Sequence, residues 1–89
     1  MYVPTAFTPN GDGLNDTFKP ILLGMKSLAY FRVYNRFGEL MFSTSQVDHG
    51  WDGVYKGKPQ DTATFVWMAG GVTYKGQVRR KKGYVVLIR

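Results

Sequence analysis

The sequence predicts an all-β domain, an immunoglobulin-like antiparallel β-sandwich of about seven strands. Aromatic residues make up 16% of the 89 residues, and rings of this size are enriched in half-buried strands. Short apolar runs are separated by turn signals at about the 8–12-residue spacing typical of sandwiches and small barrels. The only candidate helix, residues 21–30, contains Gly24 and lacks a clear capping residue. A chain of this length can bury one core, so we expect a single domain.

The chain is expected to begin with an extended segment and a tight turn. Residues 2–8 suit an edge strand, because Pro4 has no amide hydrogen to donate to a neighbour. Residues 9–13 (PNGDG) follow as a polar cluster with two glycines, which favours a turn with positive φ values.

A hairpin is predicted in the middle of the chain. Residues 27–36 read as a long strand. The residues expected to share its core-facing side are Ala29, Phe31 and Val33. Residues 37–38 (FG) give a short turn, and residues 39–44 return as the partner strand.

The second half contains a turn-rich segment and further strands. Trp51 is the expected anchor of residues 48–57, and residues 62–69 form a strong strand with Phe65 and Trp67 on one face. We expect the glycine pair at residues 70–71 to break or bend that strand.

The last third of the chain is expected to hold two more strands. Residues 72–78 predict a weaker strand, residues 79–83 a basic turn, and residues 84–89 an apolar closing strand.

Composition limits the possible functions. There is no cysteine and one histidine, His49, which excludes a disulfide framework and a thiolate metal site and argues against a His-ligated catalytic metal. No stretch of 18 apolar residues predicts a spanning helix. The first residues lack the basic start and apolar core of a signal peptide, so we expect any such signal to lie on sequence outside this chain. No nucleophile–base pair or phosphate-binding loop is evident, so we expect no enzymatic activity.

Oxygen-bearing side chains gather in the loop after residue 9. Those able to ligate a hard cation are Asn10, Asp12, Asn15 and Asp16. Calcium favours several oxygen ligands from a flexible loop, so the cluster is a candidate calcium site. We expect no other cofactor. The alternative is that Asn and Asp form side-chain-to-backbone bonds that shape a turn.

The charge is strongly basic. Twelve Lys and Arg against six Asp and Glu give a formal net charge of +6, and residues 79–82 (RRKK) are consecutive cations. Such a run can meet phosphates or anionic lipid, or simply keep a hairpin soluble. Tyr30, Arg32 and Tyr34 combine rings and charge on one strand face, but the predicted fold matches no nucleic-acid module, so we expect no nucleic-acid binding.

The end of the chain is apolar on both faces. Its residues are Gly83, Tyr84, Val85, Val86, Leu87, Ile88 and Arg89. Chain ends are usually polar, so this strand is either buried in the sandwich or offered to a partner as a pairing edge. We take these residues as a candidate partner-binding segment.

Five segments, in order, resemble one known family. They are residues 7–18 (FTPNGDGLNDTF), 33–42 (VYNRFGELMF), 50–57 (GWDGVYKG), 64–67 (TFVW) and 82–89 (KGYVVLIR). Together they resemble the gliding-motility-associated C-terminal domain, the type B sorting domain of the type IX secretion system. The residues of the opening family motif are Asn10, Gly11, Asp12, Gly13, Asn15 and Asp16. Phe37 stands where the family commonly has Trp, and the glycine pair and the basic run are not family features.

The resemblance implies a function that spacing alone does not. Such domains end large exported proteins, including adhesins, of Bacteroidetes-type bacteria, so we expect residues 1–89 to be one C-terminal sorting domain taken from a larger exported protein. The domain would fold in the periplasm and be read by the type IX translocon with a PorP/SprF-like outer-membrane protein. The parent would reach the cell surface or the medium. The alternative is a carbohydrate- or surface-binding β-sandwich module, built on exposed rings such as Trp67 or Tyr74. The sequence leaves the oligomeric state open.

Overall fold

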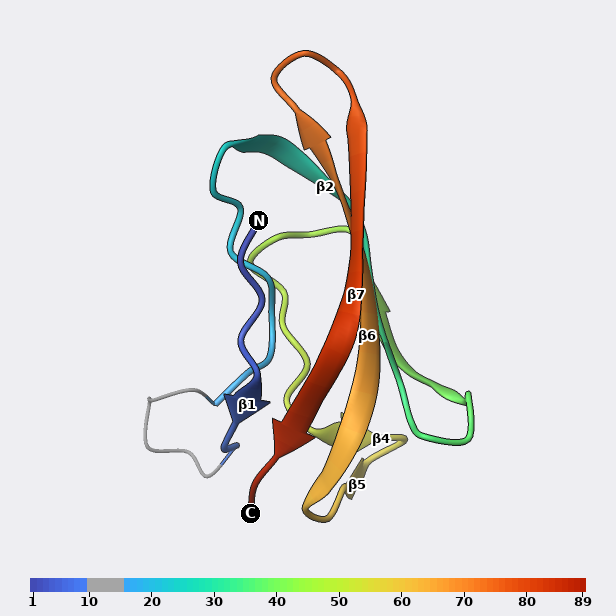
Figure 1. The fold of residues 1–89 in the computed structure, drawn as a ribbon. Coiled ribbons are helices and arrows are strands. Elements are labelled where there is room, and N and C mark those ends of the chain that lie inside the picture. Colours follow the sequence, from blue (N-terminus) through green and yellow to red (C-terminus); the bar gives the residue numbers. More distant parts are fainter. Residues whose placement is uncertain (10–15) are drawn as a thin grey trace.

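The computed structural model describes residues 1–9 and 16–89, and every regular element in these ranges is a β-strand (Figure 1). The strands are β1 (Ala6–Phe7), β2 (Met25–Tyr34), β3 (Leu40–Thr44), β4 (Val54–Tyr55), β5 (Lys58–Pro59), β6 (Ala63–Thr73) and β7 (Val78–Leu87). The predicted all-β fold of about seven strands is confirmed.

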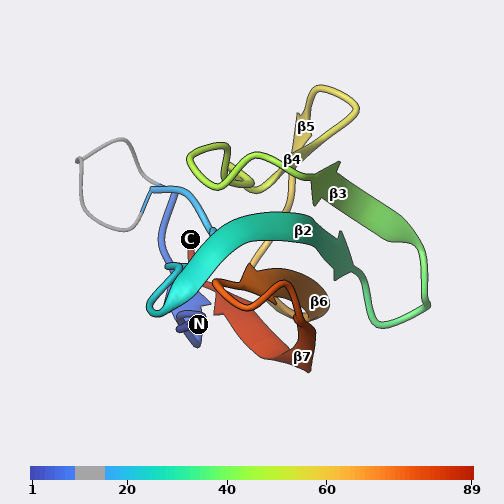
Figure 2. The ribbon, with the colours of Figure 1, turned by 90° about the horizontal axis from the view of Figure 1, so that it is seen from above.

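Five strands form the main sheet in the order β1-β7-β6-β2-β3, and β4 and β5 form a separate small sheet. The pairs β2–β3, β2–β6 and β6–β7 are antiparallel, and the first of them is the predicted hairpin. The pair β1–β7 is parallel, with Ala6 opposite Val86 and Phe7 opposite Leu87. A purely antiparallel sheet is therefore not what forms, because the start of the chain runs beside its end in the same direction. Figure 2 shows the sheet twisting from β7 through β6 and β2 to β3.

The second layer of the sandwich is built mostly from irregular chain. Residues 1–5, 16–24 and 45–53 lie on one side of the main sheet (Figure 1). Two isolated bridges tie these segments together, Tyr2 with Ile21 and Phe18 with Trp51. The second bridge has both backbone bonds, from Phe18 N to Trp51 O at 2.8 Å and from Trp51 N to Phe18 O at 2.9 Å. These bonds satisfy backbone groups that would otherwise be buried without partners.

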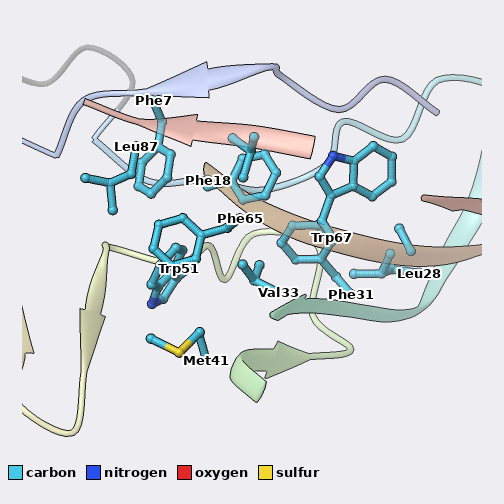
Figure 3. Packing of buried hydrophobic residues seen from close by; sticks show 12 residues of the cluster. Phe7, Phe18, Leu28, Phe31, Val33, Met41, Trp51, Phe65, Trp67 and Leu87 are labelled. Atoms are coloured by element: carbon cyan, nitrogen blue, oxygen red, sulfur yellow. The ribbon is translucent and has the colours of Figure 1, made fainter. Parts of the chain in front are cut away.

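Large rings fill the space between the layers (Figure 3). Trp51 is 1% exposed, which confirms its predicted role as an anchor, and its ring centroid lies 4.9 Å from that of Phe65. Phe18 is fully buried between Phe7 and Phe31, whose ring centroids lie 5.5 Å and 5.2 Å from its own. Such ring pairs contribute beyond the area they bury, so the core depends on residues drawn from both layers.

The long strand β2 departs from strict alternation. Phe31 and Val33 are buried as predicted, but Ala29 is exposed and Leu28 takes the core position. The register with β6 shifts between Leu28 and Tyr30, so a β-bulge turns the first part of the strand by one residue. A single strand's polarity pattern does not reveal such a bulge.

The glycine pair does not break β6. This strand runs through Gly70 and Gly71 to Thr73, and both glycines pair with β7. A Cβ at Gly70 would lie 2.5 Å from a carbon of the Tyr30 ring, and one at Gly71 would lie 2.9 Å from a carbon of Met1. The glycines leave room for neighbouring side chains, and the strand continues.

The predicted weak strand at residues 72–78 and basic turn at residues 79–83 are also wrong. The turn lies earlier, where Thr73 N donates to Gln77 O at 2.8 Å and Gly76 N donates to Thr73 O at 2.9 Å. Gly76 has a φ of 82°, which favours glycine at this position. The basic run therefore belongs to strand β7 rather than to a loop.

Candidate docking surface

The closing segment, residues 83–89, contributes both to the core and to the surface. Val85 and Leu87 are fully buried, whereas Tyr84 is 71% exposed and Ile88 is 44% exposed. This division follows from the two-residue period of a strand. Three of the predicted partner-binding residues alternate with the core residues and are accessible to a partner. Tyr84 and Ile88 are exposed, and Val86 is half-buried.

The segment is paired on both sides near its end. Val86 N donates to Thr5 O at 2.9 Å, and Ile88 N donates to Phe7 O at 3.0 Å, while β6 pairs with the opposite edge. An edge already occupied by β1 is not open for strand addition at Val86 and Ile88. Any contact made here uses side chains rather than the backbone of these residues.

Arg89 joins three separate parts of the chain. Its guanidinium donates to the backbone oxygens of Gln60 at 2.6 Å, Gly53 at 3.1 Å and Pro9 at 3.2 Å. Its backbone N also donates to Thr62 Oγ1 at 2.9 Å. A guanidinium has five donors in a fixed fork, which suits it to several acceptors at once. Arg89 is thus a structural clamp at the lower end of the sandwich in Figure 1.

The opening family motif is described only at its flanks. Asn10, Gly11, Asp12, Gly13 and Asn15 lie outside the described residues, and Asp16 lies inside them. The motif's two phenylalanines, Phe7 and Phe18, stack in the core with an interplanar angle of 21°. Their contact holds the two ends of the loop together. Within residues 1–9 and 16–89, no group of three or more His, Asp or Glu side chains could hold a metal ion.

The central motif is a side-chain-stabilised turn. Asn35 Oδ1 accepts hydrogen bonds from the backbone N of Phe37 and of Glu39, both at 2.9 Å. Gly38 has a φ of 84°, a value that glycine adopts without strain. Phe37 is 81% exposed at the tip of the turn. The motif therefore fixes the β2–β3 turn and presents one ring to solvent.

The third motif, residues 50–57, forms a turn that packs against the closing strand. Trp51 Nε1 donates to Val54 O at 3.0 Å, and Asp52 Oδ1 accepts from Val54 N at 3.0 Å. Gly53 has a φ of 79°, and a Cβ there would lie 3.0 Å from a methyl carbon of Leu87. These family residues serve the packing of the closing strand.

The two rings named for a carbohydrate platform do not form one. Trp67 is buried, as are the neighbouring rings of Trp51 and Phe65, and Tyr55 is half-buried. Tyr74 is 75% exposed at the tip of the β6–β7 hairpin, away from these rings.

A second accessible surface lies on the main sheet. The side facing away from the irregular layer carries Tyr30, Arg32 and Tyr34 from β2, the strand face that the sequence predicts to combine rings with charge. Sequence reasoning missed the residues beside them, among them Met68 and Lys82. The sequence indicates only that these residues alternate with core residues along β6 and β7. Which side chains of neighbouring strands lie beside them depends on the register between the strands. No helix in the described part of the chain is long and apolar enough to cross a membrane.

Comparison with known proteins agrees with this arrangement of motifs. Residues 1–87 match the model of the family described as CHU_C, type IX secretion signal domain. A search of curated proteins found no match. A signal domain of this kind directs export across the outer membrane, to the cell surface or the medium, through interaction with the secretion system. Because the match covers nearly all of the chain, this protein belongs to the type IX secretion signal domain family.

Proposed function

We propose that the domain is a non-enzymatic sorting domain at the C-terminus of a larger exported protein. Its folded surface, rather than a linear peptide, is recognised by the type IX translocon together with a PorP/SprF-like outer-membrane protein. The match to a secretion signal family supports this proposal, as does the absence of a nucleophile–base motif around the single histidine, His49.

The observation that carries the proposal is the division of the closing segment. Val85 and Leu87 are fully buried, while Tyr84 and Ile88 project from the same segment into solvent. The core therefore fixes the backbone that carries the exposed side chains, so docking of this segment costs little backbone entropy. We propose that Tyr84, Val86 and Ile88 contact the translocon or its outer-membrane partner.

Surface variants of a reporter fusion test this proposal. The reporter carries the domain at its C-terminus, behind a signal peptide, in a bacterium with a type IX system. The double variant Tyr84→Ser with Ile88→Ser is expected to lower the amount of reporter in the medium by about tenfold, the effect of losing roughly 1.4 kcal/mol of binding.

The matched control is Tyr74→Ser with Leu23→Ser. These residues are 75% and 65% exposed, at the tip of the β6–β7 hairpin and in the irregular layer, and the control is expected to be exported normally. Thermal unfolding of each purified domain checks folding. Normal export of the Tyr84 and Ile88 variant, with the domain folded, would show that the closing segment is not the recognised surface.

Carbohydrate binding is less well supported. Trp67 is 7% exposed, and saccharide platforms need accessible rings in a row. Tyr74 is exposed, but it lies at the tip of the β6–β7 hairpin, apart from Trp67 in the core.

A further inference from the structure

The uncovered side of the main sheet carries an ordered set of side chains, which we name the outer face. Its residues are Tyr30, Arg32, Tyr34, Val66, Met68, Arg80, Lys82 and Tyr84. Cross-strand pairing sets them in rows, with Val66 between Tyr34 and Tyr84, and Met68 between Arg32 and Lys82. The irregular segments pack on the opposite side of the sheet, against the buried residues (Figure 1).

The charged residues of the outer face have one sign. Arg32, Arg80 and Lys82 are all cations, and each occupies a position that pairs with Met68 or Gly70 on β6. Arg36 adds a further cation at the rim, and the carboxylate of Asp61 borders the hollow beside Tyr84 at the far corner. The centre of the face therefore has positive charge and no carboxylate.

Apolar and aromatic surface lies between these charges. Tyr84 is 71% exposed and Met68 is 39% exposed. A shallow hollow is lined by Tyr30, Met68 and the residues Arg80, Lys81 and Lys82, and a second hollow includes Tyr34, Val66 and Met68. The Arg32 guanidinium lies 4.8 Å from the centre of the Tyr30 ring, which helps to hold it in place.

The alternation of β7 divides the basic run between the two sides of the sheet. Arg80 and Lys82 lie on the outer face, in register with Gly70 and Met68. Lys81 is in register with the buried Ala69, and its Nζ donates to the backbone oxygen of Met1 at 3.1 Å. The run is therefore not one dense cationic cluster of the kind that a polyanion would favour.

We propose that the outer face docks onto an acidic protein surface of the secretion system. Tyr, Met and Arg are the residues enriched in the centres of protein–protein interfaces, and the spaced cations require carboxylates opposite them. The tyrosine rings and the Met68 thioether lie between these cations, so they fit a partner that has apolar side chains between its acidic residues. This inference rests on the proposed function, because it assigns the partner's chemistry to a component of the secretion system.

Charge reversal tests the outer face directly. The variant is Arg32→Glu, Arg80→Glu and Lys82→Glu. The matched control is Lys56→Glu, Lys58→Glu and Lys75→Glu, three exposed lysines in the small sheet and the β6–β7 turn. Each substitution replaces a positive charge with a negative one and so lowers the net charge by two, and both triple variants bring the formal net charge of +6 to zero.

The first measurement is binding of the purified domains to a PorP/SprF-like outer-membrane protein in detergent micelles. Outer-face reversal is expected to weaken binding at least tenfold, and the control less than twofold. Raising the salt from 0.05 to 0.5 M should weaken wild-type binding and leave binding of the outer-face variant nearly unchanged. Equal losses in both triple variants would assign the effect to net charge and overturn the proposal.

The second measurement separates a protein partner from a lipid. Sedimentation with phosphatidylcholine vesicles containing lipid A is expected to show no difference between wild type and outer-face variant. Loss of lipid A binding on reversal, with the protein interaction intact, would assign the face to lipid phosphates and overturn the proposal.

Reporter export distinguishes failure of this inference from failure of the proposed function. Normal export and partner binding of the outer-face variant, with loss in the Tyr84 and Ile88 variant, would overturn the acidic docking face and leave the closing segment as the recognised surface. Export of the reporter without any dependence on the domain would overturn the proposed function itself.

Discussion

The ring of Tyr30 lies over Gly70 on the neighbouring strand, so that a Cβ at residue 70 would approach the ring carbon Cε1 to 2.5 Å. The two residues are register partners between β2 and β6. Glycine weakens a strand because it has no side chain to pack, but here the cross-strand ring covers the backbone in place of one. This contact explains why β6 continues through its glycine pair, and it produces a sharp test of the sheet.

Gly70→Ala is expected to destabilise the domain by about 1–3 kcal/mol, because the added methyl group forces the Tyr30 ring to move. Urea unfolding measures this loss. In a Tyr30→Ala background, where the ring is absent, the same change is expected to cost much less, since alanine has the higher strand preference of the two. Equal costs in the two backgrounds would show that the ring does not determine the need for glycine.

Phe18→Ala is expected to cost about 3–5 kcal/mol, because a fully buried ring between Phe7 and Phe31 leaves a cavity when it is removed. This is a large share of the roughly 5–15 kcal/mol that stabilises a domain. Phe37→Ala is the matched control, since Phe37 is 81% exposed; its effect is expected to stay within about 0.5 kcal/mol. Denaturant midpoints compare the two variants, and similar midpoints would contradict the assignment of Phe18 to the core.

Arg89→Met is expected to lower stability by about 1–2 kcal/mol, because it removes the charged donor from the oxygens of Pro9, Gly53 and Gln60. Arg89→Lys is expected to recover only part of this loss, since an ammonium cannot reproduce the fork of the guanidinium. Amide hydrogen exchange should show faster opening around Gly53 in both variants. Unchanged exchange at Gly53 would mean that the clamp does not restrain that segment.

Calcium remains a prediction for the opening loop. If Asn10, Asp12, Asn15 and Asp16 bind the ion, millimolar calcium should raise the unfolding temperature, because a ligand that binds only the folded state stabilises it. Asp12→Ala should then abolish the shift, while Asp48→Ala, a carboxylate elsewhere in the chain, should preserve it. An unfolding temperature unaffected by calcium, with Asp12→Ala as stable as the wild type, would support the turn-only interpretation.

Much of the fold could be predicted because local patterns determine it. Phe65 and Trp67 share one face of β6, as predicted, and that face is buried. Asn35 with Gly38 directs the turn between β2 and β3 through contacts within five residues of sequence. The family motifs, taken in order, also indicate the secretion signal family, which the match over residues 1–87 confirms. Such signals are carried by neighbouring residues, so the sequence alone contains them.

The tertiary structure decided what depends on residues far apart in the chain. Leu28 replaces Ala29 in the core because of a bulge opposite β6, and Gly70 remains within a strand because Tyr30 covers it. The outer face exists only because the register aligns Arg32, Met68 and Lys82. A shift of one residue would send each side chain to the opposite face, so pairing between strands, which no local pattern encodes, determines which charges and rings share a surface.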